Sequence, residues 1–471
     1  MFQFSATIEG SGVHSLFRIC EDYICLCKRD LCLFVLGTEA SNYFKWYYES
    51  RIVIPNRVIL RKGGMILLLR ILLLLIIFCF DVCTMASAEH PLTAAFTRDH
   101  QLWVKQGNQE IQLTRNQYVY DPKWSYDGRF IGYIDGDEHG EKSDLFIYDT
   151  KEKESYQPYV RVSTSDFKWS PIKNQLAYSN QGLLNVTKMN NNRPQGFENV
   201  SLGVSGFEWF PNGREFIVSS QSSLRPTGWG PIPLYRIPAD ASLNRDKMKP
   251  FYTIQTKEPD LFGIEADYFK WSYDGKWLSF LVIPTASWSM DSNTLGAISS
   301  QAKYFQAVGK MLGFEDWFKW SPSSNQLAYI SGEGRFFVEN KNMMIAEMPT
   351  TSQQKEYTPN GFVDLDLEWF TKDFVIVSRA KENKEWKEGP VPTMFTSLYV
   401  IDIRTGEQNQ ISFPRKKELD ENPQVVGTKL TWFRRKAEEQ KGEVWMKEGL
   451  NGKERIWIKN VDSDPVIFEP K

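Results

Sequence analysis

The decapeptide DPKWSYDGRF, residues 121–130, combines a short strand ending at Trp124, a tight turn and the start of a second strand. Asp127 and Gly128 supply the positive-φ positions that a tight hairpin needs. Similar phrases recur at DFKWSPIKNQ (166–175), GFEWFPNGRE (206–215), YFKWSYDGKW (268–277), WFKWSPSSNQ (317–326), DLEWFTKDFV (366–375) and KLTWFRRKAE (429–438). Successive phrase tryptophans lie 40 to 63 residues apart, close to the period of a four-stranded propeller blade.

These repeats predict an all-β fold, a β-propeller of about seven four-stranded blades. A small antiparallel sheet cannot bury both of its faces alone, whereas stacking such sheets in a ring covers the faces and protects the edges. We expect Trp432 to begin the last blade, and strands from both termini to close the ring within one blade. Six or eight blades remain possible, because the terminal strands can be allotted differently.

Residues 65–88, MILLLRILLLLIIFCFDVCTMASA, have the three-part order of a secretory signal peptide: a basic residue, an apolar run and a small-residue cleavage site after Ala88. The alternative is a membrane anchor, but the continuous apolar core from Ile71 to Phe80 is short of the roughly 20 residues that a spanning helix needs. We therefore expect a signal peptide over 65–88 and a mature propeller over 89–471, without a membrane span, secreted or associated with the cell envelope.

Residues 1–64 differ from the rest, and we hypothesise that they are a doubtful upstream extension. Lys62-Gly63-Gly64 can be encoded by a purine-rich ribosome-binding signal just before Met65. The chain has six cysteines, and all of them precede the expected cleavage site: Cys20, Cys25, Cys27, Cys32, Cys79 and Cys83. The mature protein would then be stabilised by its fold and not by disulfides.

Composition and motifs argue against several classes of function. The net charge of −2 gives no electrostatic reason to bind nucleic acid. His90, His100 and His139 are not paired with any nucleophile motif, and no zinc helix, P-loop or dinucleotide fingerprint occurs in the sequence. We therefore predict no catalytic residue, no metal ligand and no cofactor, although carboxylates from different blades could still converge on the ring's axis.

The phrases resemble the repeats of the TolB-like propeller family, in which a tryptophan-serine-proline-aspartate-glycine turn is followed by an apolar strand. The resemblance covers about residues 92–468. It implies a propeller fold, and TolB itself binds partner proteins of the cell envelope. TolB also has a separate amino-terminal domain, for which we expect no room between Ala88 and the ring. The same repeat serves many activities, so the resemblance does not determine the role.

The phrase tryptophans are periodic, so we interpret them as core residues packed between neighbouring sheets. Trp229, Trp288 and Trp386 break the pattern, because each falls between the second and third strands of its blade. Such connections all emerge on one face of a propeller, and exposed tryptophan anchors protein partners and sugar rings. The alternative is that each indole ring covers the edge of its own blade.

The acidic loop around Asp137 belongs to the same face. Asp137, together with Asp135, Glu138 and Asp144, could bind a hard cation, but the loop lacks the spacing of a calcium site, which favours a solvated turn. We therefore predict a non-catalytic, monomeric scaffold that binds an envelope protein or a cell-wall component through Trp229, Trp288, Trp386 and Asp137. The alternatives are an envelope hydrolase or lyase with carboxylates in the central channel, and an accessory propeller once joined to a peptidase domain.

Overall fold

The computed structural model describes three short strands near the amino terminus and residues 91–470, except 160–161, 165, 227, 257–260 and 350–353. The chain divides into two compact units, Met1–Glu89 and His90–Lys471. In the first unit, β1 (Leu16–Cys20), β2 (Tyr23–Lys28) and β3 (Leu31–Leu36) form an antiparallel sheet. The predicted signal peptide, residues 65–88, lies outside the described residues.

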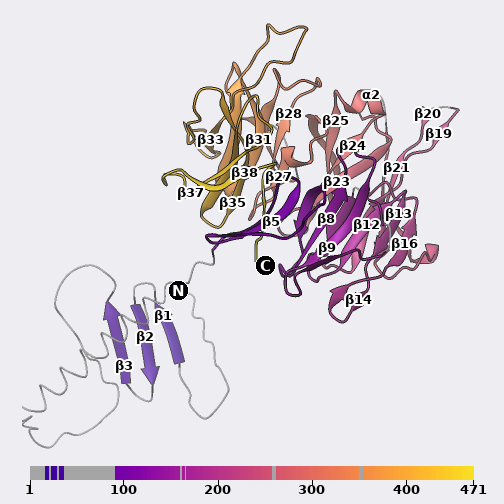
Figure 1. The fold of residues 1–471 in the computed structure, drawn as a ribbon, viewed down its shortest axis with the longest axis horizontal. Coiled ribbons are helices and arrows are strands. Elements are labelled where there is room, and N and C mark those ends of the chain that lie inside the picture. The colour runs from indigo at the N-terminus through magenta and orange to yellow at the C-terminus, as the bar shows by residue number, and fades with distance from the viewer. Residues whose placement is uncertain are drawn as a thin grey trace, which may run out of the picture. The chain divides into compact units, whose positions relative to one another are not determined.

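The second unit is an all-β propeller of eight four-stranded antiparallel blades (Figure 1). The strands of each blade are named below in order from the innermost to the outermost. Blades 1 to 4 consist of β39 (Val466–Ile467), β4 (Thr93–Arg98), β5 (Gln101–Gln106) and β6 (Gln109–Gln112); β7 (Val119–Trp124), β8 (Phe130–Gly136), β9 (Ser143–Asp149) and β10 (Glu154–Tyr156); β11 (Asp166–Trp169), β12 (Leu176–Asn180), β13 (Leu183–Val186) and β16 (Glu198–Leu202); and β17 (Gly206–Trp209), β18 (Glu215–Ser219), β21 (Ile232–Pro238) and β22 (Lys249–Ile254).

Blades 5 to 8 follow the same order. They consist of β23 (Glu265–Trp271), β24 (Trp277–Ile283), β25 (Asn293–Ser299) and β26 (Phe305–Met311); β27 (Phe318–Trp320), β28 (Gln326–Ser331), β29 (Asn342–Glu347) and β30 (Lys355–Glu356); β31 (Phe362–Thr371), β32 (Phe374–Lys381), β33 (Ser397–Asp402) and β34 (Gln408–Gln410); and β35 (Glu418–Val426), β36 (Lys429–Lys436), β37 (Gly442–Glu448) and β38 (Arg455–Val461).

Short elements decorate this ring. Two hairpins are inserted into blades 3 and 4, formed by β14 (Met189–Asn190) with β15 (Arg193–Pro194) and by β19 (Leu224–Arg225) with β20 (Gly228–Trp229). The described helical elements are the single turns η1 (Arg245–Lys247), α2 (Ala286–Ser289) and η2 (Glu315–Trp317). Among the residues with described positions, no helix has the length and apolarity needed to cross a membrane.

The apolar core lies between the blades. Separate clusters of buried side chains bridge successive pairs of blades; Phe207 and Phe216, for example, pack against Leu184 and Val200 of the preceding blade. The last such cluster joins blade 8 to blade 1, where Val444 and Ile458 meet Ala94 and Phe96. The second strands are the most buried; every residue of β8 is buried. This radial packing is what the repeats predicted.

The ring closes as expected, with strands from both termini in blade 1. The carboxy-terminal strand β39 pairs antiparallel with β4, placing Val466 opposite Ala95 and Ile467 opposite Ala94. There are eight blades, one more than the seven tryptophan phrases predict, because blade 1 contains no such phrase.

The expected start of the last blade was wrong. Trp432 lies in the second strand of blade 8, β36, and not at the end of a first strand. The first strand, β35, has the sequence ELDENPQVV and contains no tryptophan. The segment around Trp432 is similar to the tryptophan phrase, but RRKAE (434–438) stands where the other copies have turn residues. The chain therefore continues as a buried strand.

Candidate functional site

The phrase tryptophans join each blade to the one before it. Six indole N–H groups donate to backbone carbonyls on the first strand of the preceding blade, with N···O distances of 2.9–3.1 Å. The donors are Trp124, Trp169, Trp209, Trp271, Trp320 and Trp369. These bonds confirm the structural interpretation of these six tryptophans.

The residue before each of these six tryptophans is charged, and it lies on an innermost strand. First strands of neighbouring blades contact one another, so they surround the axis of the ring. The charged residues are Lys123, Lys168, Glu208, Lys270, Lys319 and Glu368. Together they make the axis a polar channel.

The lysines of the channel are held by neighbouring blades. The ammonium group of Lys168 donates to the carbonyl oxygen of Phe207 at 2.8 Å and lies 3.3 Å from Glu208 Oε2. The ammonium group of Lys319 lies 2.7 Å from Glu368 Oε2. The ammonium group of Lys270 donates to the carbonyl oxygen of Glu315 at 2.6 Å. These cations therefore already have partners within the protein.

Several carboxylates lie on first strands, as Asp166, Asp267 and Asp366 do, or just before one, as Asp464 does. Burial raises the pKa of Asp267 to about 7, and it raises the pKa of both Asp366 and Asp464 to about 6. Burial also raises the pKa of Asp166, with Lys168 opposing the shift. The channel therefore contains acids that titrate near neutral pH.

Two cavities that share lining residues lie at this channel. One, of 260 Å³, is lined by Asp316, Lys319, Asp366, Glu368, Asn422 and Asp464, among others. The second, of 410 Å³, shares Asp366 and Asn422 with the first but has aromatic and aliphatic walls. Those walls include Phe314, Trp317, Phe337, Val391 and Met394. We call the second cavity the vestibule.

The vestibule opens on one face of the propeller, which we call the loop face. This face carries the connections between second and third strands and those between successive blades. The opposite face, which we call the turn face, carries the connections between first and second strands and between third and fourth strands. Phe314 lies in the connection between β26 and β27, and Val391 lies between β32 and β33. The vestibule is therefore built by loops from blades 6, 7 and 8 around the channel mouth.

All three predicted tryptophans lie on the loop face. Trp229 is in β20 and Trp288 is in α2, and both elements lie along the upper side of the propeller in Figure 1. The Trp288 side chain is 56% exposed, and its ring lies 5.2 Å from that of Phe262 in an edge-to-face contact. Trp288 thus remains available to a ligand.

Trp386 is more constrained. Its indole N–H donates to the carbonyl oxygen of Pro390 at 3.1 Å, within its own loop. Its ring lies 4.8 Å from that of Phe336, which comes from the corresponding loop of blade 6. The contact joins two loops that are distant in the sequence. The three predicted tryptophans share a face, but the rings of Trp288 and Trp386 contact phenylalanines and not one another.

Asp137 lies on the loop face between β8 and β9, and it organises its own loop. Its carboxylate accepts the backbone N–H groups of His139 at 2.7 Å, of Glu141 at 3.2 Å and of Lys142. This is the behaviour of a turn residue. Within the described part of the chain, no group of three or more His, Cys, Asp or Glu side chains is arranged to hold a metal ion.

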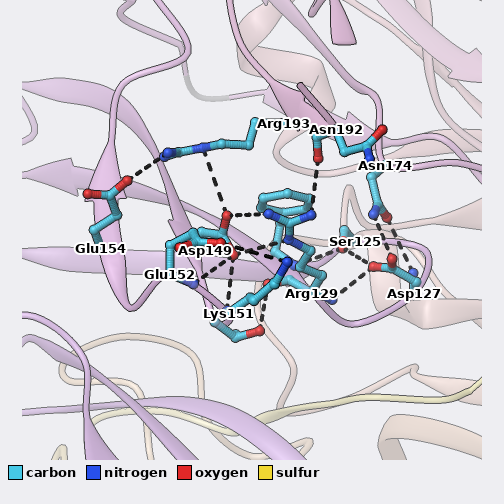
Figure 2. A network of polar contacts seen from close by, with 12 residues as sticks. Ser125, Asp127, Arg129, Asp149, Lys151, Glu152, Glu154, Asn174, Asn192 and Arg193 are labelled. Carbon is cyan, nitrogen blue, oxygen red and sulfur yellow. Dashed lines mark hydrogen bonds and ion pairs between the residues drawn. The ribbon is translucent and has the colours of Figure 1, made fainter. Parts of the chain in front are cut away.

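A separate polar network on the turn face surrounds Asp149 (Figure 2). This fully buried carboxylate pairs with Arg129 at 2.8 Å and lies 3.8 Å from Arg193 Nε. Arg193 belongs to the inserted hairpin of blade 3 and also binds Glu154 at 2.7 Å. The carboxylates of this network are thus paired with arginines of the protein itself and not left for a ligand. Since Arg193 comes from blade 3 and its partners from blade 2, we interpret the network as a structural link between these two blades.

Sequence reasoning missed the vestibule and the individual channel residues. A signal for the channel was present, since all six indole-donating tryptophans follow a charged residue. No comparable signal marked Phe314 or Phe337, because their meeting with the 391–394 loop depends on the closure of blades 6, 7 and 8 around the axis.

Comparisons with known proteins support the fold. No family model matches the chain, and no curated protein matches it. Among solved structures, dihydro-heme d1 dehydrogenase NirN matches with a TM-score of 0.53 and 12% identity, covering 81% of this chain and 75% of that one. Dipeptidyl peptidase 4 of Porphyromonas gingivalis matches at 0.50 and 10% identity, covering 79% and 60%.

A puromycin hydrolase mutant matches with a TM-score of 0.44 and 12% identity, covering 81% of this chain. The match spans only 55% of the hydrolase chain, so this chain corresponds to about half of that protein. At such identities the likeness concerns the propeller fold alone.

Proposed function

We propose that this protein is a non-catalytic binding propeller that takes a protein or cell-wall ligand on its loop face, outside the cytoplasmic membrane. The observation that supports this most is a set of exposed apolar side chains on the loop-face connections of blades 4 to 7, two of which, Phe314 and Val391, line the vestibule. They are Leu224, Trp288, Met290, Phe314, Phe336, Val391 and Phe395, each more than 40% exposed. Exposed aromatic and aliphatic groups around a concave site are typical of interaction surfaces.

Two further arguments come from the sequence. The signal-like order of residues 65–88 supports a place outside the cytoplasmic membrane. The resemblance of the repeats to those of TolB supports a partner in the cell envelope.

The test is capture of partners from envelope extracts with the full chain and with a variant in which Trp229, Trp288 and Trp386 are replaced by alanine. We expect the variant to fold and to lose the captured partners. A matched control replaces Tyr273 and Tyr304, which are 55% and 64% exposed on the turn face. Equal capture by all three proteins would refute the proposal.

A second function, hydrolase or lyase chemistry in the channel, is favoured by one observation. Burial raises the pKa of Asp267 to about 7, which suits a general acid or base near neutral pH. Purified protein should then act on peptide or polysaccharide substrates, and Asp267→Asn should abolish that activity. Absence of turnover across such a screen, with and without a chelator, would exclude this candidate.

A further inference from the structure

We propose that the vestibule and the adjoining channel bind a protein segment in which a lysine or arginine lies next to a large apolar residue. The basic side chain would enter the channel toward Asp366 and Asp464, and the apolar side chain would pack in the vestibule. This inference rests on the proposed binding function and adds the chemistry of the partner.

The smaller cavity, which shares Asp366 with the vestibule, is lined by two carboxylates, Asp366 and Asp464, that have no ion-pair partner among the described residues. Asp464 accepts from the side-chain amides of Asn422 and Gln424, both at 3.3 Å, and Asp366 accepts from the backbone N–H of Asn422 at 3.1 Å. No ion pair of either carboxylate is found among the described residues. Neutral donors compensate a buried carboxylate only partly, so a cation from outside would be stabilised here.

The nearby cations of the protein cannot fill this role. Lys319 lines the same cavity, but its ammonium group is paired with Glu368 at 2.7 Å. Arg435 lines the vestibule in a two-pronged pair with Glu421, with N···O distances of 2.8 and 3.1 Å. Because both cations are engaged, an anionic guest would find no free partner in them. The charge balance therefore favours a cationic guest.

The vestibule walls determine what should accompany the cation. The rings of Phe314 and Trp317 lie 4.8 Å apart, and those of Phe314 and Phe337 lie 5.8 Å apart. Phe314 is 42% exposed, so part of this aromatic surface is available. A volume of 410 Å³ lies within the range typical of binding pockets. An aromatic or long aliphatic side chain beside the basic residue fits these walls.

The experiment selects peptides from a random library on the immobilised full chain and then measures the affinity of an enriched peptide by fluorescence polarisation. We expect enrichment of a basic residue next to an aromatic or aliphatic one. Asp366→Asn with Asp464→Asn should weaken binding about tenfold or more. Asp240→Asn, at a surface carboxylate with an 82% exposed side chain, should change nothing. Phe314→Ala should weaken binding independently.

A double-mutant cycle makes the assignment specific. Replacing the basic residue of the peptide by glutamine should cost affinity for the wild-type chain but little more for the double asparagine variant. Enrichment of acidic or neutral peptides, no enrichment, or equal affinity of both proteins would overturn the inference. If envelope partners are still lost with the tryptophan variant in that case, the proposed function stands and only the partner chemistry is wrong.

Discussion

At the scale of single residues, each phrase acts in two directions. Its tryptophan donates a hydrogen bond to the preceding blade, and the charged residue just before it faces the channel, where several of these side chains contact the following blade. Structure and channel chemistry are therefore encoded side by side in the same few residues. A substitution at the tryptophan should lower the free energy of unfolding. A substitution of a channel carboxylate should change how that free energy depends on pH.

The first prediction concerns one of these indole bonds. Trp169→Phe keeps an aromatic ring but removes the N–H that reaches the carbonyl oxygen of Lys123 at 2.9 Å. We expect a loss of unfolding free energy of about 1–2 kcal/mol, measured by urea denaturation. The control is Trp103→Phe, because the buried Trp103 indole N–H has no hydrogen-bond partner within the described residues. Equal losses in both variants would contradict the role of the bond.

The second prediction concerns the charge of Asp366. Burial raises its pKa to about 6, above the value of about 3.9 for an unfolded chain. Between these two pH values the folded protein binds more protons at this group than the unfolded chain does. The group therefore makes folding less favourable as the pH rises from about 4 to 6. Asp366→Asn should therefore stabilise the protein by about 1–2 kcal/mol at pH 8 and by little at pH 4.

Thermal unfolding at both pH values tests this expectation. Asp240→Asn serves as the control, because that side chain is 82% exposed and should not make stability differ between the two pH values. A destabilised Asp366→Asn at the higher pH would show that the carboxylate has a cation partner in the folded protein.

At the scale of elements, the turn after the first strand must fit its neighbours. Gly128 has φ of +74°, and a Cβ added there would lie 2.7 Å from the ring of Phe468, which follows the closing strand β39. Gly275 is the matching turn residue of blade 5, with φ of +65°, and its Cβ would lie 3.4 Å from Pro211, which is an ordinary van der Waals distance. The two turns are alike in backbone but differ in what covers them.

This difference gives the third prediction. Both Gly128→Ala and Gly275→Ala place alanine in a left-handed backbone conformation, which lowers the free energy of unfolding by about 1 kcal/mol. Only Gly128→Ala also displaces Phe468, so we expect it to lose about 1–3 kcal/mol more in urea unfolding. Combining it with Phe468→Ala should remove most of the difference. Equal effects of the two glycine substitutions would show that Phe468 does not press on this turn.

The sequence predicted the elements well wherever the phrase was complete. Turn residues such as Asp127-Gly128 and the apolar second strands located blades 2 to 7 correctly. It failed at blade 8, because a tryptophan alone does not mark a first strand. In β35 the strand ends at Val425 and Val426, and the buried Trp432 belongs to the next strand. The physical mark of a first strand is the turn that follows it.

At the scale of the whole molecule, only ring closure brings the candidate site together. The vestibule takes Phe314, Val391 and Arg435 from three blades and lies over carboxylates of β31 and the segment before β39. The loop face and the placement of three tryptophans on it followed from strand order alone. The vestibule could not be predicted, because it depends on how far the loops reach across the axis.

The last prediction tests closure itself. Ending the chain after Ser463 removes Asp464 and β39, the innermost strand of blade 1. It also removes the Val466 carbonyl that accepts the Trp124 N–H at 2.9 Å. We expect a broad, multi-step unfolding curve in place of one cooperative transition, since neighbouring blades would then unfold from the open seam. A synthetic peptide of residues 463–471 should restore cooperativity when added in excess, because it can pair with β4 as the native strand does. A peptide with proline in place of Val466 is the control. A truncated chain that still unfolds in one sharp transition would show that the ring holds without its closing strand.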